Sequence, residues 1–278
     1  MNTVEFTALV GMGSLLAGFL GALTGLGGGV VIVPMLALLF HVDLKYAIGA
    51  ALVSVIATSS GAAAAYVKEG YSNIRVGIFL EIATTIGALA GAALAMVLHA
   101  SVIAVTFGVV LIYSAYSSIR HVDHATQDLG PDRIATWLRM DGTFPGEHGL
   151  ESYRVRGVPM GFAIMFVAGV LSGLLGIGSG AVKVLAMDKA MKLPFKVSTT
   201  TSNFMIGVTA AASAGIYLGR GYIDPGLAMP VMLGVLLGSV AGARVLAVAN
   251  VQVLRYVFSG VIAVMAIEMI YSGLTGRL

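Results

Sequence analysis

Six long stretches of this sequence contain no lysine, arginine, aspartate or glutamate. They are residues 6–42, 46–67, 82–119, 157–182, 197–219 and 225–243. A helix needs about 20 residues to cross a hydrocarbon core about 30 Å thick, and most of these stretches are long enough. Charged side chains are rarely tolerated in that core. The sequence therefore predicts an all-α integral membrane protein that crosses the bilayer several times.

The composition excludes a soluble fold. Of the 278 residues, 58% are hydrophobic and 10% are charged, whereas soluble domains carry about 25% charged residues. There is no cysteine, which excludes disulfides, thiol catalysis and thiolate metal sites. The net charge of +3 comes from basic residues in predicted loops and does not indicate nucleic-acid binding. We expect the lipid bilayer and a small anionic substrate as partners, and no nucleic acid. No lysine or arginine precedes Lys45, so the first apolar segment is expected to be a retained helix rather than a cleavable signal.

An internal repeat divides the chain into two halves. Shifting the sequence by 151 residues aligns the halves without a gap at three separate places. Residues 25–29 fall on 176–180, Gly70-Tyr71 falls on Gly221-Tyr222, and 86–92 falls on 237–243. Three matches at one offset are not expected by chance, so the sequence predicts a duplication. The transmembrane repeats are residues 1–119 and 157–278, joined by the polar segment 120–156, where a short amphipathic helix is expected near 134–140.

Each half is expected to form five helical elements. In the first half they are 4–24, 28–40, 46–67, 74–98 and 101–119. In the second they are 157–175, 180–191, 196–218, 223–248 and 251–275. The second element of each half has about 12 residues, or about 18 Å, and either crosses at a tilt or re-enters. Glycine pairs at four-residue spacing, Gly87 with Gly91 and Gly234 with Gly238, are expected to pack helices closely.

The distribution of basic residues favours five crossings per half. With the connector in the cytoplasm, five crossings place most of the lysines and arginines inside, as the positive-inside rule requires. Lys45, Arg220 and Arg277 then lie outside, with Lys183 as a fourth candidate for that side. Four crossings per half nearly remove the bias. An odd number of crossings inverts one half relative to the other, which is typical of secondary transporters with a central site between the repeats.

The glycine-rich segments are predicted to interrupt helices at the binding site. Their residues are Gly25, Gly27, Gly28 and Gly29 in the first half and Gly176, Gly178, Ser179 and Gly180 in the second. Clustered glycines destabilise a helix interior, and a broken helix is tolerated in a membrane where protein or a cavity satisfies its backbone. The N–H groups that open the following helix favour an anion. The alternatives are helix packing and a nucleotide-binding loop, and the latter lacks its lysine and its βαβ context.

Polar groups of the second half extend this candidate site. Lys183 follows the second break and either supplies positive charge to an anion or extends to an interface. A polar run opens the helix after Pro194, and its site candidates are Thr200, Thr201, Ser202 and Asn203. Glu81 and Glu268 are candidates for a functional carboxylate, and Glu81 for proton coupling, because carboxylates inside membranes are usually functional. Both lie near helix ends, so an interfacial location is the alternative. Ser54, Thr58 and Thr209 are weaker candidates, and Thr58 and Thr209 are repeat equivalents.

These segments resemble the TauE/SafE sulfite exporter family. The resemblance rests on residues 25–34, on 176–180 and on the helix 196–203 after Leu193-Pro194, and it covers nearly the whole chain outside the connector. It implies transport of sulfite, organosulfonates or related sulfur anions across a bacterial cytoplasmic membrane, with the breaks and the polar helix as the substrate region. Ser179 and Leu185 stand where the family commonly has glycine and proline.

We therefore expect a secondary transporter of small sulfur-containing anions that works by alternating access. No cofactor, metal or catalytic residue is expected. A passive anion channel shares the same site chemistry and is the main alternative. A membrane-embedded enzyme is the other, although no Ser–His pair or His–Glu metal pattern lies within the predicted spans. The sequence leaves open whether the chain forms a homo-oligomer.

Overall fold

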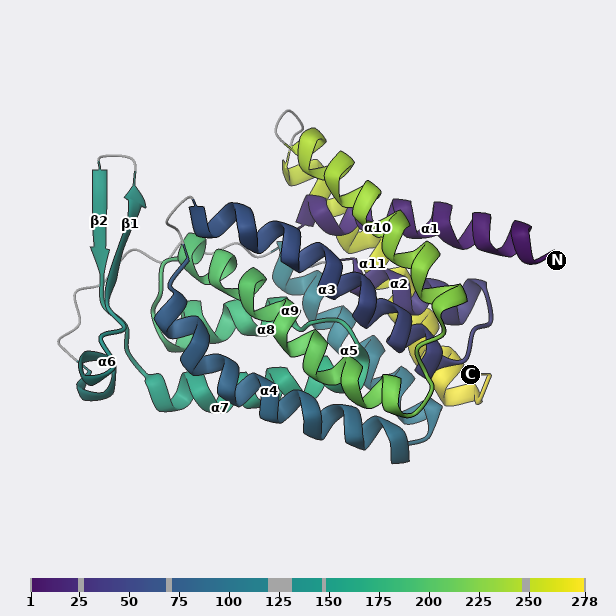
Figure 1. Cartoon of the computed structure of the whole chain (residues 1–278), viewed down its shortest axis with the longest axis horizontal. Helices are drawn as coiled ribbons and strands as arrows, with labels where there is room; N and C mark the ends of the chain where they lie inside the picture. Colours follow the sequence, from purple (N-terminus) through teal and green to yellow (C-terminus); the bar gives the residue numbers. More distant parts are fainter. Residues whose placement is uncertain are drawn as a thin grey trace.

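The computed structural model describes residues 2–24, 28–68, 72–119, 132–146, 149–246 and 251–277. Long helices run roughly along one axis of the molecule (Figure 1). A small β-hairpin and a short helix lie at one end of this bundle, and both termini lie toward the other. The predicted all-α membrane fold is confirmed.

The helices recur at the predicted spacing. The first half contains α1 Thr3–Thr24, α2 Gly29–Pro34, the π-helix η1 Met35–Leu39, α3 Leu44–Lys68, α4 Ile74–Val97 and α5 Ala100–Ile119. The second half contains α7 Val158–Leu175, α8 Gly180–Leu185, the π-helix η2 Ala186–Ala190, α9 Phe195–Gly219, α10 Pro225–Leu246 and α11 Val251–Thr275. From α2 onward, each element of the second half begins 151 residues after its counterpart. Even the π-turns recur, although Pro34 precedes only the first of them.

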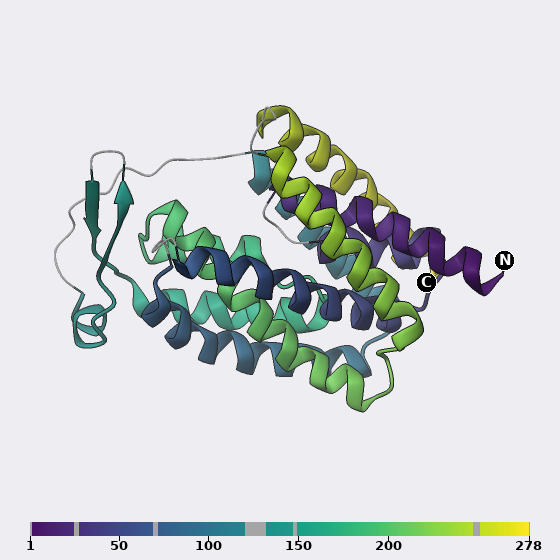
Figure 2. The same cartoon turned by 45° about the horizontal axis from the view of Figure 1, so that its top comes forward.

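Helices of one half pack mainly on helices of the other. The major pairs are α1 with α10, α4 with α7, α3 with α9, and α5 with α11. Figures 1 and 2 show α1 beside α10 in both views. The first element of each half thus packs on the fourth element of the other half, and the third and fifth elements pack on their own counterparts. The pairing is unchanged when the two halves are exchanged.

Glycines make the closest of these contacts. A methyl group on Gly87 would overlap the carbonyl oxygen of Phe166, and one on Gly238 would overlap that of Leu15. Gly87 and Phe166 lie 151 residues from Gly238 and Leu15, respectively. Gly91 and Gly234 likewise face backbone oxygens of the opposite helix. The predicted packing role of both glycine pairs is confirmed, and its physical basis is that only glycine lets two backbones approach this closely.

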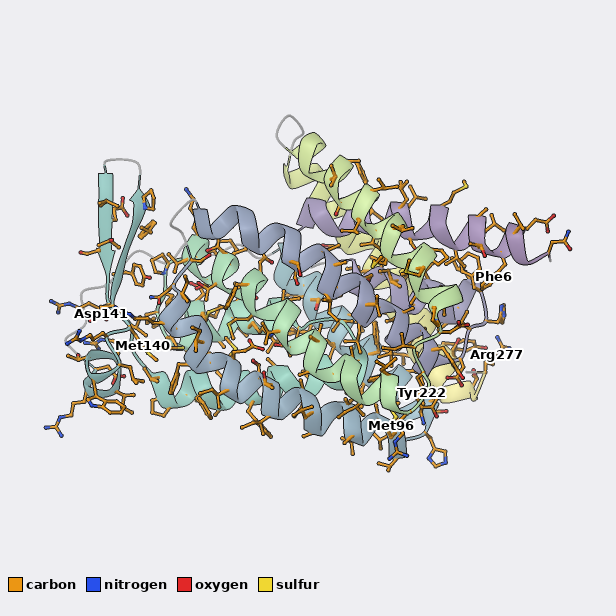
Figure 3. The ribbon with its side chains drawn as sticks, viewed as in Figure 1. Phe6, Met96, Met140, Asp141, Tyr222 and Arg277 are labelled. Atoms are coloured by element: carbon orange, nitrogen blue, oxygen red, sulfur yellow. The ribbon has the colours of Figure 1, made fainter. Side chains whose placement is uncertain are left out.

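Counterpart helices α3 and α9 run in opposite directions. Near the start of α3, Lys45 Nζ donates to the Met96 carbonyl at 3.2 Å and lies 5.5 Å from the centre of the Tyr222 ring, just beyond α9. Near the start of α9, the Thr201 hydroxyl accepts from the backbone N–H of Asn73, just beyond α3, at 3.0 Å. Figure 3 shows Met96 and Tyr222 at the end of the bundle opposite Met140. Each of the two helices therefore begins where the other ends.

Four helices are long and apolar enough to cross a membrane, within the ranges that the structure describes. They are α1, α4, α7 and α10, the first and fourth of the five elements of each half. Many of their apolar side chains are exposed, among them Met12, Ile78, Ile86, Val167 and Leu237. In a bilayer these side chains face lipid, so the chain is a multi-pass membrane protein.

The connector folds onto the end of the bundle. The predicted short helix is present as α6 Arg133–Trp137, whose first turn is capped by Asp132. The hairpin of β1 Gly142–Gly146 and β2 Gly149–Tyr153 was not predicted. Ala135, Met140, Phe144 and Tyr153 are buried in one cluster with residues of α4, α7 and η2. The connector is therefore packed on the bundle over this part of its length.

Asn73 joins the connector to the bundle. Its Oδ1 accepts from the backbone N–H of Val76 at the start of α4, and its Nδ2 donates to the Met140 carbonyl and the Tyr153 hydroxyl, each at 2.8 Å. We expect Asn73→Ala to lower the free energy of unfolding by about 2–3 kcal/mol, because a helix cap contributes about 1 kcal/mol and each further hydrogen bond about 1 kcal/mol. Thermal unfolding in detergent measures the loss, and trypsin cleavage within residues 132–156 should accelerate.

Asp132→Ala is the matched control for this variant. Asp132 caps only α6, through the Ile134 N–H at 2.9 Å, so its loss should leave the unfolding temperature of the bundle nearly unchanged. Equal effects of the two substitutions, or an unchanged cleavage rate in Asn73→Ala, would show that Asn73 does not hold the connector in place.

Candidate functional site

The second glycine segment is an irregular break between two helices. α7 ends at Leu175 and α8 begins at Gly180. Between them Gly176 and Gly178 have φ values of 70° and 72°, and Ser179 has a φ of 48°. Glycine adopts these left-handed values without a Cβ clash, whereas a serine there is uncommon. The predicted unwinding of this segment is confirmed.

The two breaks meet inside the protein. Gly25 and Gly27 lie outside the described residues, whereas Gly28 has a helical φ of −67° and Gly29 opens α2. A methyl group built on Gly29 would lie 3.1 Å from the Gly176 carbonyl oxygen and 3.5 Å from the Ile177 Cα. The start of α2 is therefore in direct contact with the second break.

Apolar side chains of α3 and α9 enclose both breaks. A Cβ on Gly29 would lie 2.9 Å from Val55 Cγ2, and one on Gly180 would lie 2.9 Å from Ile206 Cδ1. These two pairs are again related by the 151-residue offset. Residues 28–29 and 176–180 are all buried, so these parts of the two glycine segments are closed to solvent in this conformation.

Lys183 is fully buried beside the second break and belongs to a polar chain across three helices. Its Nζ donates to the Thr209 hydroxyl of α9 at 2.5 Å, and that hydroxyl lies 2.7 Å from Glu81 Oε1 of α4, to which it donates. The Thr85 hydroxyl donates to the same carboxylate oxygen at 3.2 Å. Lys183 and Thr209 are 0% exposed and Glu81 is 8% exposed. An ammonium group, a hydroxyl and a carboxylate are thus connected in the interior of a membrane protein.

The opposite charges of Lys183 and Glu81 compensate each other. An isolated charge in a medium of low dielectric constant is strongly destabilised, whereas an opposite charge nearby offsets much of that cost. Two polar atoms of the site are buried and have no hydrogen-bond partner within the described residues: Glu81 Oε2 and Ser179 Oγ. Ser179 precedes Lys183 by one helical turn, and the Lys183 N–H donates to its carbonyl at 3.1 Å. The site therefore keeps unused hydrogen-bonding capacity next to its cation.

The polar run of α9 is only partly directed at the break. The Ser202 hydroxyl donates to the Gly180 carbonyl at 3.4 Å. Thr201 bonds to Asn73, and Thr200 donates to the backbone carbonyls of Lys196 and Val197. The Asn203 side chain is half-buried and makes no hydrogen bond within the described part of the chain. Ser202 is thus the member of this run that the structure joins to the break by a hydrogen bond.

The link between Lys183 and Glu81 was missed by sequence reasoning. Lys183, Thr209 and Glu81 have Ile32, Thr58 and Met232 as their counterparts at the 151-residue offset, so this set of polar groups has no equivalent at the positions related by the duplication. The offset marked Thr209 through Thr58 but gave no reason to connect it with Glu81. A signal was present in the departures from symmetry, since two polar residues replace apolar counterparts.

The sequence was compared with known families and proteins. The profile described as "Sulfite exporter TauE/SafE" matches residues 10–269. A probable membrane transporter protein, YunE of Bacillus subtilis, is 28% identical over 98% of this chain and 99% of its own. The probable membrane transporter protein YdhB of the same organism is 26% identical over 83% and 84% of the two chains. A third, MJ0441 of Methanocaldococcus jannaschii, is 26% identical over 92% of each. No solved structure matches the chain.

Proposed function

The chain belongs to the TauE/SafE sulfite exporter family of membrane proteins, and we propose that it is a secondary transporter of small sulfur-containing anions. Its relatives bear the names of probable membrane transporters, and their similarity extends over nearly the full length of the chain. Sulfite and short organosulfonates are the proposed substrates, because the family description names sulfite and because the positive charge of Lys183 in the candidate site can pair with an anion.

The observation that carries this proposal is the fully buried ammonium of Lys183. Its nearest hydrogen-bond partner is a neutral hydroxyl, and an unpartnered serine oxygen lies one turn away. A small oxyanion would take a charge-assisted hydrogen bond from Lys183 and a neutral one from the Ser179 hydroxyl. Ser202 and the backbone N–H groups of the two breaks complete the proposed site, with Asn203, Thr200 and Thr201 farther along the same helix.

Inverted repeats and alternating access are part of the proposal. Support comes from the opposite directions of α3 and α9, from the pairing of helices between the halves, and from the meeting of the two breaks. In such an architecture one half rocks against the other around a central site. The burial of residues 28–29 and 176–180 supports a conformation closed to solvent, which an alternating carrier requires and an open channel does not.

We further propose that the connector faces the cytoplasm, in a bacterial cytoplasmic membrane. Arg75 bonds to the Arg139 carbonyl of the connector, and Lys196 lies at the start of α9, near the same end. Lys45 lies at the opposite end, beside Met96, as does Arg277 (Figure 3). This distribution follows the positive-inside rule when the connector end is inside.

Binding is tested by thermal unfolding of the purified protein in detergent with increasing sulfite, thiosulfate, methanesulfonate or acetate. A ligand that binds only the folded state at 100 times its Kd stabilises that state by about 2.7 kcal/mol. We expect saturable stabilisation by a sulfur anion and little by acetate. Equal stabilisation by all four anions, or by none, would contradict the assignment to sulfur anions.

Transport is tested in proteoliposomes loaded with the unlabelled anion. An alternating carrier accumulates labelled anion transiently through exchange, whereas a channel lets both pools equilibrate and shows no overshoot. We expect the overshoot. A conductance proportional to voltage without exchange would replace the carrier by a passive channel.

A further inference from the structure

The chain from Lys183 to Glu81 joins the two halves of the protein. Glu81 lies on α4 of the first half, whereas Lys183 and Thr209 lie on α8 and α9 of the second. The only hydrogen bonds between described residues that connect them pass through the Thr209 hydroxyl. A movement of one half against the other would change this contact, so the carboxylate is placed where transport and charge can be coupled.

The net charge of the buried site is the central constraint. Without an anion, the Lys183 ammonium and the Glu81 carboxylate sum to zero. A bound monovalent anion would bring the sum to −1, and the excess charge would be costly in a closed membrane site. One proton on Glu81 restores the sum to zero. The two neutral states are therefore the ionised pair without substrate and the ammonium–anion pair beside a protonated carboxyl.

We propose that Glu81 takes up one proton with each anion that binds at Lys183, so that the protein moves anion and proton together in a one-to-one ratio. This inference rests on the proposed function. The anion replaces Glu81 as the counter-charge of Lys183, and the proton neutralises the carboxylate that is released. The bound proton crosses with the anion and leaves with it, when Glu81 again pairs with Lys183. Net flux then follows the sum of the anion and proton gradients.

The groups around Glu81 favour Glu81 itself as the residue that carries the proton. On its own helix the groups beside it are the hydroxyls of Thr84 and Thr85, and α9 contributes Thr209. Lys183 is the charged residue that acts on the carboxylate. α7, which packs along α4, contains no ionisable residue. The other charged residues of these elements are Arg75 near the start of α4, Lys196 near the start of α9, and Asp188 and Lys189 on η2.

Oε2 of Glu81 provides the site for the proton. Oε1 accepts from Thr209 and Thr85, whereas Oε2 is buried and has no partner within the described residues. A carboxylate oxygen that lacks a donor is the one that accepts a proton without displacing an existing hydrogen bond. Protonation at Oε2 would leave the Thr209 contact in place while it removes the charge that competes with the anion for Lys183.

The experiment uses proteoliposomes that contain a pH-sensitive dye, with methanesulfonate as the probe because this anion stays fully ionised at every pH used. In the wild-type protein, an inward methanesulfonate gradient is expected to acidify the lumen, with one proton per anion. Glu81→Gln mimics the protonated carboxyl. We expect it to retain exchange of labelled methanesulfonate, to lose the acidification, and to lose the pH dependence of uptake. Retained exchange also demonstrates that the variant is folded.

Glu268→Gln is the matched control, since Glu268 is an exposed acid on α11, and it should acidify the lumen as the wild type does. Proton movement that persists in Glu81→Gln, or wild-type exchange without any proton movement, would overturn this inference and leave the transporter intact. Absence of exchange in the wild type would instead overturn the proposed function for sulfonates, and this inference with it.

Discussion

Replacing Lys183 with methionine is expected to weaken anion binding by about tenfold to a hundredfold and to reduce transport to background. A hydrogen bond to a charged group contributes about 1.5–3 kcal/mol, and each 1.4 kcal/mol is a factor of ten in affinity. Lys183 is fully buried, so water cannot take its place. The loss should appear as a thermal-shift titration with sulfite that no longer saturates.

Folding of the Lys183 variant can be separated from binding. Methionine has a similar length, is flexible and fits irregular interior sites, so the detergent-solubilised variant should remain monodisperse on size exclusion. Lys189→Met removes a charge six residues along the chain, from an exposed position on η2, and should bind the anion like the wild type. Normal affinity in Lys183→Met, or an equal loss in Lys189→Met, would remove Lys183 from the site.

The helices could be predicted from the sequence because each membrane-spanning helix requires about 20 consecutive apolar residues. Charge-free segments of sufficient length located the long helices, and the 151-residue offset located the short ones. α2 Gly29–Pro34 and α8 Gly180–Leu185 begin where the glycine segments end, as expected from the high cost of clustered glycines in a helix. The packing role of Gly87 and Gly238 followed from the same reasoning.

The β-hairpin was beyond local prediction. Its strands, Gly142–Gly146 and Gly149–Tyr153, contain glycine and proline and are only five residues long. Their intrinsic strand propensity is low, and their position depends on tertiary contacts. Buried Phe144 and Tyr153 pack in the cluster at the end of the bundle, and Tyr153 bonds to Asn73. No periodic pattern within residues 120–156 reports such contacts.

The residues of the candidate site were named one by one from the sequence, whereas their spatial arrangement was not predicted. Lys183 and Glu81 were identified separately because each is an ionisable residue in an apolar segment. Their connection through Thr209 requires α4 of one half to lie against α9 of the other, which neither segment encodes alone. For the polar run 198–203, the sequence left helix capping, bonds to neighbouring helices and an anion path open, and in the structure Thr200 and Thr201 engage backbone groups within α9 and at Asn73. Small hydroxyl side chains can satisfy local backbone groups as well as a ligand, and the sequence does not distinguish the two uses.

The duplication therefore repeats the packing contacts but not the charged groups. Contacts that hold the halves together are repeated, as at Gly87 with Phe166 and Gly238 with Leu15. The charged groups are not repeated, since the position equivalent to Lys183 is Ile32. In the proposed alternating carrier, this symmetric framework would let the two halves exchange roles with the same packing, while a single set of polar groups would bind the anion.

Alanine at Gly87 is expected to destabilise the protein by about 1–3 kcal/mol, and alanine at Gly238 by a similar amount. In both variants the new methyl group would overlap a backbone carbonyl oxygen of the facing helix, that of Phe166 or that of Leu15. Backbone atoms cannot turn aside as a flexible side chain does, so the helices must separate, and overpacking of this kind costs about 1–3 kcal/mol. The two sites share no partner, so the double variant should show the sum of the single losses.

Gly215→Ala provides the control, because Gly215 is an exposed position of α9 where an added methyl group would meet no atom within 4 Å. Its unfolding midpoint in denaturing detergent should equal that of the wild type or exceed it, since alanine favours the helix over glycine by about 1 kcal/mol. The midpoints of Gly87→Ala and Gly238→Ala should both fall, and by comparable amounts. If only one midpoint falls, the two helix interfaces do not contribute equally to stability. The two halves would then differ in stability even though their contacts match.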